Sequence, residues 1–104
     1  MAGNRIELWG RVLGEPELRT TPAGTSVLRI QMEAADAPGA FVLGAVMTGE
    51  EARLRAGILN SGTEVMVKGT LKAIRRRLKS GLPETAYEVV AESIEVAAPV
   101  GRQK

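Results

Sequence analysis

Cysteine and histidine are both absent from the 104 residues of the chain. Their absence removes disulfides, thiolate nucleophiles, imidazole general bases and the commonest zinc ligands. Hydrolysis by a Ser-His-Asp or Cys-His arrangement is therefore excluded. The one adjacent pair of carboxylates, Glu50 and Glu51, is better explained as acids in the first turn of a helix. We expect no catalysis, no cofactor and no metal.

Long apolar runs are also absent. No segment approaches the ~20 apolar residues of a membrane span, and the N-terminus lacks the cationic region and apolar stretch of a signal peptide. A chain of this length supports one domain with a modest core. We therefore expect a soluble, cytoplasmic protein with no membrane contact. Its single domain should cover residues 1–98, followed by a short, basic and disordered tail over residues 99–104.

Negative charge is missing from one place in particular. Residues 72–79 hold five cations and no acid, whereas the remaining cations are outnumbered by the 12 Asp and Glu residues of the chain. The net charge of +2 is mild, so the basic character is local. Because this run joins two strand-like segments, it predicts a cationic hairpin that docks a polyanion.

Alternation of apolar and polar residues predicts strands, with turn-forming residues between them. The predicted strands are residues 6–13, 25–34, 41–47, 63–74 and 85–96. Gly10 permits a bend or bulge in the first strand, and Gly14-Glu15-Pro16 is not expected to continue it. Thr48-Gly49-Glu50-Glu51 offers a helix cap with acids in the first turn, and residues 52–59 predict a short helix.

The order of these elements is β-β-β-α-β-β. It predicts an all-β protein with the OB fold, a five-stranded Greek-key barrel with a short helix between strands 3 and 4. Oligonucleotides bind OB folds on the strand 2–3 face and at the loops joining strands 1–2 and 4–5. The cationic run falls in the predicted 4–5 loop. Spacing alone also fits another small barrel.

Four segments of the chain resemble the bacterial single-stranded-DNA-binding proteins. They are NRIELWGRV (residues 4–12), ELRTTPAGT (residues 17–25), GTEVMVKGTL (residues 62–71) and YEVVAESIEV (residues 87–96). Within that superfamily the chain is most similar to the primosomal replication protein N group, whose members end soon after the fifth strand. The sequence likewise ends soon after Val96, without a Gly/Pro-rich linker or an acidic tip.

This resemblance implies an accessory protein of replication restart. Proteins of that group form homodimers of OB folds and bind single-stranded DNA. They associate with the restart helicase and other primosome proteins, and bridge the helicase to the factor that recruits the helicase loader. The partners implied for this chain are accordingly single-stranded DNA, the restart helicase and a second copy of the chain.

The same resemblance indicates which residues contact DNA. Arg75, Arg76, Arg77 and Lys79, with Lys72 behind them, match the basic 4–5 loop of the family. Each phosphate contact on a single strand changes the salt slope by about −0.7, and arginine also stacks on bases. The alternative is a solvated hairpin tip whose charge prevents edge association.

Arginines outside this run are more ambiguous. Arg19 matches a basic position on the family's DNA surface, although an ordinary exposed arginine fits equally well. Arg11 and Arg29 lie on the non-core registers of the first two strands. They could face phosphate, but pairing with Glu7 and Glu33 is preferred.

Aromatic residues number only three. Phe41 lies close to a stacking aromatic of the family, but a place in the core is equally compatible with the sequence. Trp9 shares a register with charged residues, so it lies on the outer sheet face or, as we prefer, in a dimer interface. Tyr87 is assigned a structural role.

The sequence also departs from its relatives. The 2–3 loop carries Asp36 and no cation, and strand 5 begins with acids at Glu84 and Glu88. Weak DNA binding that depends on the 4–5 loop is therefore expected. Two other hypotheses remain: a general binder of single-stranded DNA or RNA, and an OB-fold protein-interaction module with weak nucleic-acid binding. The missing acidic tip favours the accessory role over a general binder of single strands. The scarcity of aromatic residues favours the protein-interaction module.

Overall fold

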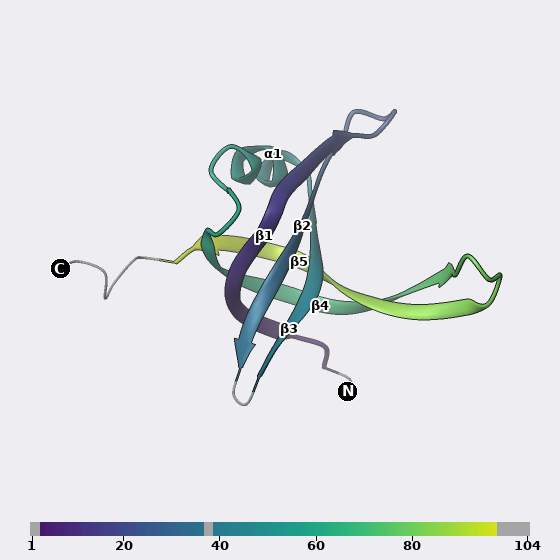
Figure 1. Cartoon of the computed structure of the whole chain (residues 1–104). Helices are drawn as coiled ribbons and strands as arrows, with labels where there is room; N and C mark the ends of the chain where they lie inside the picture. Colours follow the sequence, from purple (N-terminus) through teal and green to yellow (C-terminus); the bar gives the residue numbers. More distant parts are fainter. Residues whose placement is uncertain (1–2, 37–38, 98–104) are drawn as a thin grey trace.

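The computed structural model describes residues 3–36 and 39–97, which form five long strands and one short helix (Figure 1). In chain order these are β1 (Ile6–Thr20), β2 (Ser26–Asp36), β3 (Gly39–Thr48), α1 (Glu50–Ala56), β4 (Glu64–Arg77) and β5 (Pro83–Val96). The predicted order of elements is confirmed. The basic tail predicted over residues 99–104 lies outside the described residues.

The five strands close into a barrel in the order β1-β2-β3-β5-β4. β1 pairs antiparallel with both β2 and β4, and the parallel pairing of β3 with β5 completes the circle. A closed five-stranded barrel with a helix between β3 and β4 is the OB fold, so the predicted fold class is confirmed. In the part of the chain that the structure describes, no helix is long and apolar enough to cross a membrane.

Two glycines allow neighbouring strands of the barrel to approach closely. Gly10 is paired with β2 on one side and with β4 on the other. A Cβ on Gly10 would lie 2.2 Å from the carbonyl oxygen of Glu33, and one on Gly69 would lie 2.1 Å from that of Val90. Only glycine fits at such backbone contacts. Both pairings of β1 keep their register at Gly10, so the bulge that the sequence allowed there is not seen.

β1 is longer than the sequence predicts. It continues through Pro16 to Thr20, although the Gly14–Pro16 stretch was expected to end it. The pairing with β2 shifts register between Leu13 and Glu17, and Gly14 adopts a positive φ of 70° within that shift. The irregularity accommodates the proline without ending the strand, which alternation alone does not reveal.

Helix α1 begins where the sequence predicts, with Glu50 and Glu51 in its first turn. Its N-cap is Gly49, at a φ of 93°, within the segment predicted to cap the helix, although no side chain caps the first turn. The helix ends at Ala56, earlier than predicted. Leu59, just beyond it, is nevertheless buried in the core.

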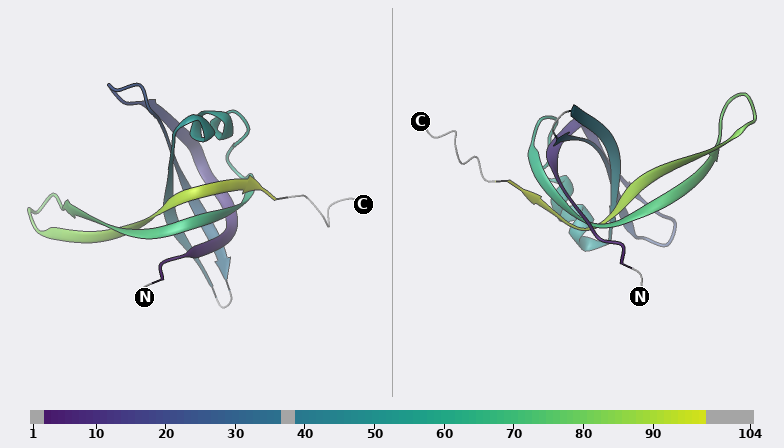
Figure 2. Two further views of the ribbon diagram at one scale, coloured as in Figure 1. Left: turned by 180° about the vertical axis from the view of Figure 1, so that it is seen from behind. Right: turned by 90° about the horizontal axis from the view of Figure 1, so that it is seen from below.

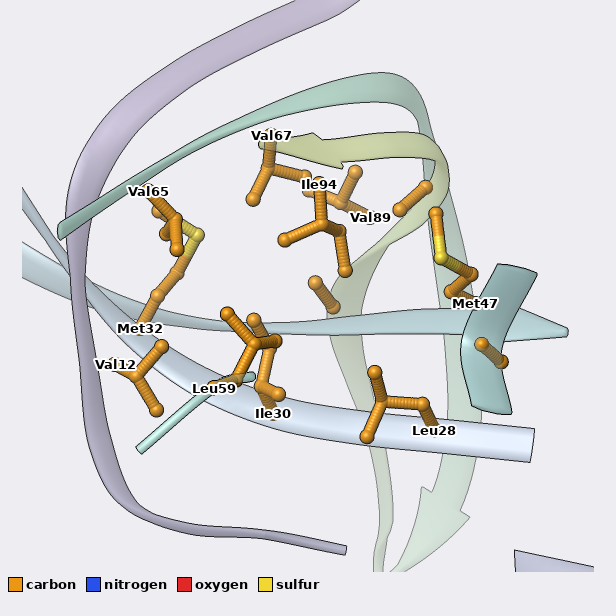
Figure 3. Packing of buried hydrophobic residues seen from close by; sticks show 13 residues of the cluster. Val12, Leu28, Ile30, Met32, Met47, Leu59, Val65, Val67, Val89 and Ile94 are labelled. Carbon is orange, nitrogen blue, oxygen red and sulfur yellow. The ribbon is translucent and has the colours of Figure 1, made fainter. Parts of the chain in front are cut away.

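The core is aliphatic, and side chains from all five strands point into it (Figure 3). The labelled members are Val12, Leu28, Ile30, Met32, Met47, Leu59, Val65, Val67, Val89 and Ile94. None of the three aromatic residues is among the buried residues: Trp9 is 58% exposed, Phe41 45% and Tyr87 54%. The core alternative for Phe41 is therefore wrong.

β4 and β5 extend beyond the barrel as a two-stranded ribbon, residues 72–87, which we call the arm (Figures 1 and 2). The expected basic loop is mostly strand: β4 runs to Arg77, and only residues 78–82 turn. Two backbone hydrogen bonds close the turn: the N–H of Leu78 donates to the carbonyl oxygen of Leu82, and the N–H of Gly81 donates to that of Leu78. An exposed ribbon has no buried face, so apolar and polar residues need not alternate along it. For this reason the sequence pattern indicates a loop at the run of charged residues, although most of it is strand.

Candidate nucleic-acid interface

A groove of about 880 Å³ opens where β3 and β5 separate. The two strands pair only between Gly44–Val46 and Glu88–Val90. On the N-terminal side of this pairing the two strands diverge. β3 stays in the barrel, and β5 lies in the arm (Figure 2). Residues of β2, β3, β4 and β5 line the groove, so it connects the strand 2–3 face with the arm.

Positive charge dominates the groove. Its lining contains four cations, Arg29, Lys72, Arg75 and Arg76, and one carboxylate, Glu88. Glu88 is buried and accepts a hydrogen bond of 2.9 Å from Nη1 of Arg29. A polyanion in this groove therefore meets cations, while the one carboxylate is already paired. No group of three or more acidic side chains in residues 3–36 and 39–97 is placed to hold a metal ion.

The cations of the arm occupy both faces of the ribbon. Successive side chains of a strand point to opposite faces. Lys72 and Arg76 therefore share one face of β4, whereas Arg75 and Arg77 share the other. Lys79 lies in the turn at the tip. The structure thus gathers the five predicted cations on one projecting element, with their charges distributed around it.

Most of these cations have no acidic partner. Arg76 lies 3.4 Å from Glu84 of β5, and Arg77 donates a 2.8 Å hydrogen bond to the carbonyl oxygen of Gly81. Four cations of the arm form no ion pair with any residue that the structure describes. These are Lys72, Arg75, Arg77 and Lys79.

Tyr87 is a groove residue that sequence reasoning assigned to a structural role. It lines the groove and is 54% exposed, and its side chain makes no hydrogen bond or ring contact with the described residues. The residue opposite it on β4 is Ala73, too small to cover an aromatic ring. The sequence carries no signal for this pairing, because the register of β4 and β5 is known only from the structure.

The other two aromatic residues lie outside the groove lining. Phe41 is on β3, one residue before the part of that strand that lines the groove. Trp9 is on the outer face of β1, beside a separate hollow of about 450 Å³ that Arg11 and Glu33 also line. The structure therefore brings Tyr87 to the arm cations, and neither Trp9 nor Phe41.

Ion pairs account for the arginines of β1 and β2. Arg19, 75% exposed in its side chain, pairs with Glu17 at 2.7 Å. Arg11 pairs with Glu33 at 3.1 Å. Arg29 pairs with Glu88, a partner that the sequence did not suggest. Arg19 and Arg29 share a hollow of about 260 Å³, so Arg29 links the groove to Arg19.

The model of the single-strand binding protein family matches residues 3–97. The chain belongs to this family. The match spans all five strands and the helix, so it includes both the groove and the arm. No curated protein matches the sequence.

Proposed function

We propose that this member of the single-strand binding protein family binds single-stranded DNA in the groove between the strand 2–3 face and the arm. The observation that carries the proposal is the charge of the groove, where four cations face one buried and already paired carboxylate. The name of the family supports a single strand as the ligand. The groove also coincides with the surface that OB folds use for oligonucleotides.

Phosphate contacts supply most of the affinity. Each neutralised phosphate of a single strand releases counterions and contributes about −0.7 to the slope of log K against log salt. If Lys72, Arg75, Arg77 and Lys79 each contact one phosphate, the slope is about −3. Binding is then strong at low salt and weak at high salt. Arg19 extends the cationic path beyond Arg29 along β1.

Tyr87 adds base stacking to these phosphate contacts. Its exposed ring lines the groove, and it shares a face of the arm with Arg75 because it lies opposite Ala73. Stacking on an aromatic side chain is worth about 1–3 kcal/mol per base and tolerates any sequence. Phe41, exposed on the neighbouring stretch of β3, is a second stacking candidate. The expected result is binding without sequence preference.

The finer role is that of an accessory protein in the replication-restart primosome, acting as a homodimer. The support for this role is the resemblance of four segments to the primosomal replication protein N group. Trp9, 58% exposed on the outer face of β1, is the proposed dimer contact. Sedimentation at low micromolar concentration should show a species of twice 11.0 kDa, and Trp9→Ala should return it to the monomer. A pull-down with the restart helicase, with and without DNA, tests the primosome role.

Titration of labelled oligo-dT at about 50 and 200 mM salt tests DNA binding. The wild type should bind with a slope of about −3, and the double variant Arg75→Gln/Arg77→Gln should reduce that slope by about 1.4. Arg53→Gln/Arg55→Gln is the matched control, because it removes the same charge from α1, away from the arm (Figure 1). Equal losses in both variants would show that the arm is not the site. The same titration with oligo-U compares RNA with DNA.

A further inference from the structure

Two leucines are exposed at the tip of the arm. Leu78 and Leu82 are 45% and 62% exposed, and they lie just beyond the last pair of the β4–β5 ladder, Arg77 with Pro83. The N–H of Leu78 donates a 2.8 Å hydrogen bond to the carbonyl oxygen of Leu82, so the two residues face each other. Side chains that lie opposite each other on paired strands share one face. The tip therefore presents a small apolar surface at the end of a ribbon rich in cations.

Cations lead from the groove to these leucines. Along β4 the lining of the groove ends at Arg76. Another hollow, of about 270 Å³, begins there and is lined by Arg75, Arg76, Arg77 and Pro83. Lys79 follows in the turn, and neither Arg77 nor Lys79 forms an ion pair with a residue that the structure describes. A polyanion that leaves the groove along the arm would therefore meet further cations and then the apolar tip.

The spread of the cations favours nucleic acid over a lipid surface as the ligand. A flat surface that touches the tip cannot also touch the base of the ribbon. From Lys72 to Arg77 β4 advances about 17 Å, at about 3.3 Å per residue, and its cations lie on both faces. At physiological salt a charge acts over about 8 Å, so Lys72 would contribute little to the binding of a membrane at the tip. A chain of phosphates can instead run along the whole arm.

We propose that the tip of the arm contacts the junction at which single-stranded DNA becomes a duplex. Leu78 and Leu82 pack against the terminal base pair, which exposes an apolar face once the unpaired strand turns into the groove. Arg77 and Lys79 contact phosphates beside that base pair. Leucine is among the apolar side chains that DNA-binding proteins place against bases. This contact rests on the proposed function, because the groove holds the single strand that leads to the junction.

The junction contact differs in its chemistry from the binding of a single strand. Phosphate contacts are common to single strands and duplexes, and salt weakens both. The two leucines carry no charge, so replacing them should leave the salt slope unchanged. Burial of their exposed parts against a base pair should raise the affinity for a junction about tenfold above that for a single strand.

The test compares fluorescein-labelled DNAs by anisotropy. The single strand is oligo-dT of about 16 nucleotides, the upper end of the site size of one OB fold. The other DNAs are a blunt hairpin duplex and the same hairpin with the oligo-dT as a tail of either polarity. The wild type should bind one tailed hairpin about tenfold more tightly than oligo-dT or the blunt hairpin. In that complex the NMR signals of the Leu78 and Leu82 methyl groups should shift more than with oligo-dT, because they lie against the rings of the base pair.

A double variant locates the contact on the tip. Leu78→Ser/Leu82→Ser should bind the tailed hairpin no more tightly than oligo-dT, and should keep the affinity of the wild type for oligo-dT. Leu54→Ser/Ile58→Ser is the matched control in and just beyond α1, away from the arm (Figure 1). Leu54 and Ile58 are 52% and 50% exposed, so this variant should fold like the first and keep the tenfold preference.

Equal affinity of the wild type for oligo-dT and both tailed hairpins would overturn the junction contact and leave the proposed function standing. A preference that survives Leu78→Ser/Leu82→Ser would also overturn it. Equal losses for oligo-dT and the tailed hairpin would instead assign the leucines to the single-strand site. Failure to bind any of these DNAs would reject the proposed function, and the junction contact with it. Leucine-dependent binding to phosphatidylglycerol vesicles, without a preference for a tailed hairpin, would assign the tip to a lipid surface.

Discussion

Arg29 of β2 and Glu88 of β5 form an ion pair across β3, with Nη1 of Arg29 2.9 Å from Oε1 of Glu88. The side chain of Glu88 is 12% exposed, while that of Arg29 is 55% exposed. The carboxylate is therefore held inside the sheet surface, and the guanidinium still faces the solvent of the groove. The pair neutralises Glu88, the one carboxylate of the groove, and leaves the guanidinium of Arg29 accessible to a ligand.

Neutralising this carboxylate should tighten DNA binding. Glu88→Gln removes the anion and leaves Arg29 fully charged for phosphate, so the affinity for oligo-dT at low salt should rise severalfold. The glutamine oxygen can still accept from Arg29, and Arg29 is largely solvated. The free energy of unfolding should therefore fall by about 1 kcal/mol or less. Fluorescence anisotropy and urea denaturation measure the two effects.

The matched control is Glu51→Gln on α1. Glu51 pairs with Arg55 at 2.9 Å, so this variant makes the same charge change away from the groove. It should leave the affinity for oligo-dT close to that of the wild type. If both variants tighten binding equally, net charge rather than the groove controls the affinity.

The strand order could be predicted from the sequence because a buried barrel face imposes alternation. Leu28, Ile30 and Met32 of β2 are all buried, as the pattern indicates. The pattern failed where no face is buried or where the strand is irregular. The arm has no buried face, and β1 passes Pro16 only through a register shift.

The site could be predicted in part, since a run of charge is visible in the sequence. Lys72 and the three arginines of β4 lie together on the arm as expected. The ion pair of Arg29 with Glu88 could not be predicted, because these residues are 59 positions apart and meet only when the barrel closes. Tyr87 was missed because its exposure depends on its partner Ala73, which is known only once the register of the arm is known.

Tyr87 should contribute binding energy that salt does not screen. Tyr87→Ala should weaken oligo-dT binding about fivefold or more at every salt concentration without changing the salt slope. Tyr87→Phe keeps the ring and should bind like the wild type. Because the side chain is exposed, neither variant should lower the melting temperature appreciably. A salt slope that changes in Tyr87→Ala, or equal losses in both variants, would argue against stacking.

Gly69 should not tolerate a side chain. A Cβ there would lie 2.1 Å from the carbonyl oxygen of Val90 and 2.9 Å from Cα of Ala91, which are backbone atoms of the paired strand. Gly69→Ala must therefore push β4 and β5 apart, and should cost about 1–3 kcal/mol or more. The melting temperature should fall by about 4–8 °C per kcal/mol.

Gly44→Ala is the control for this prediction. Its Cβ would meet first the side-chain nitrogen of Gln31, at 3.2 Å, and a flexible side chain can move away. The variant should therefore unfold within a few degrees of the wild type. Similar melting temperatures for Gly69→Ala and Gly44→Ala would contradict the close approach of the strands at Gly69.

Asn4 should stabilise β4 at Leu71, where the arm leaves the barrel. Its side-chain amide donates a 2.8 Å hydrogen bond to the carbonyl oxygen of Leu71 and accepts one of 2.9 Å from the N–H of Leu71. The amide thus acts as one further residue of the β1–β4 ladder, whose last pair joins Ile6 to Gly69. Asn4→Ala removes both bonds, so the amide of Leu71 should exchange about tenfold faster. The amide of Val67, in the barrel, should keep its rate. Asn4→Asp retains the acceptor and should protect Leu71 in part; exchange at Leu71 that is unchanged in Asn4→Ala would mean that the arm is fixed by β5 alone.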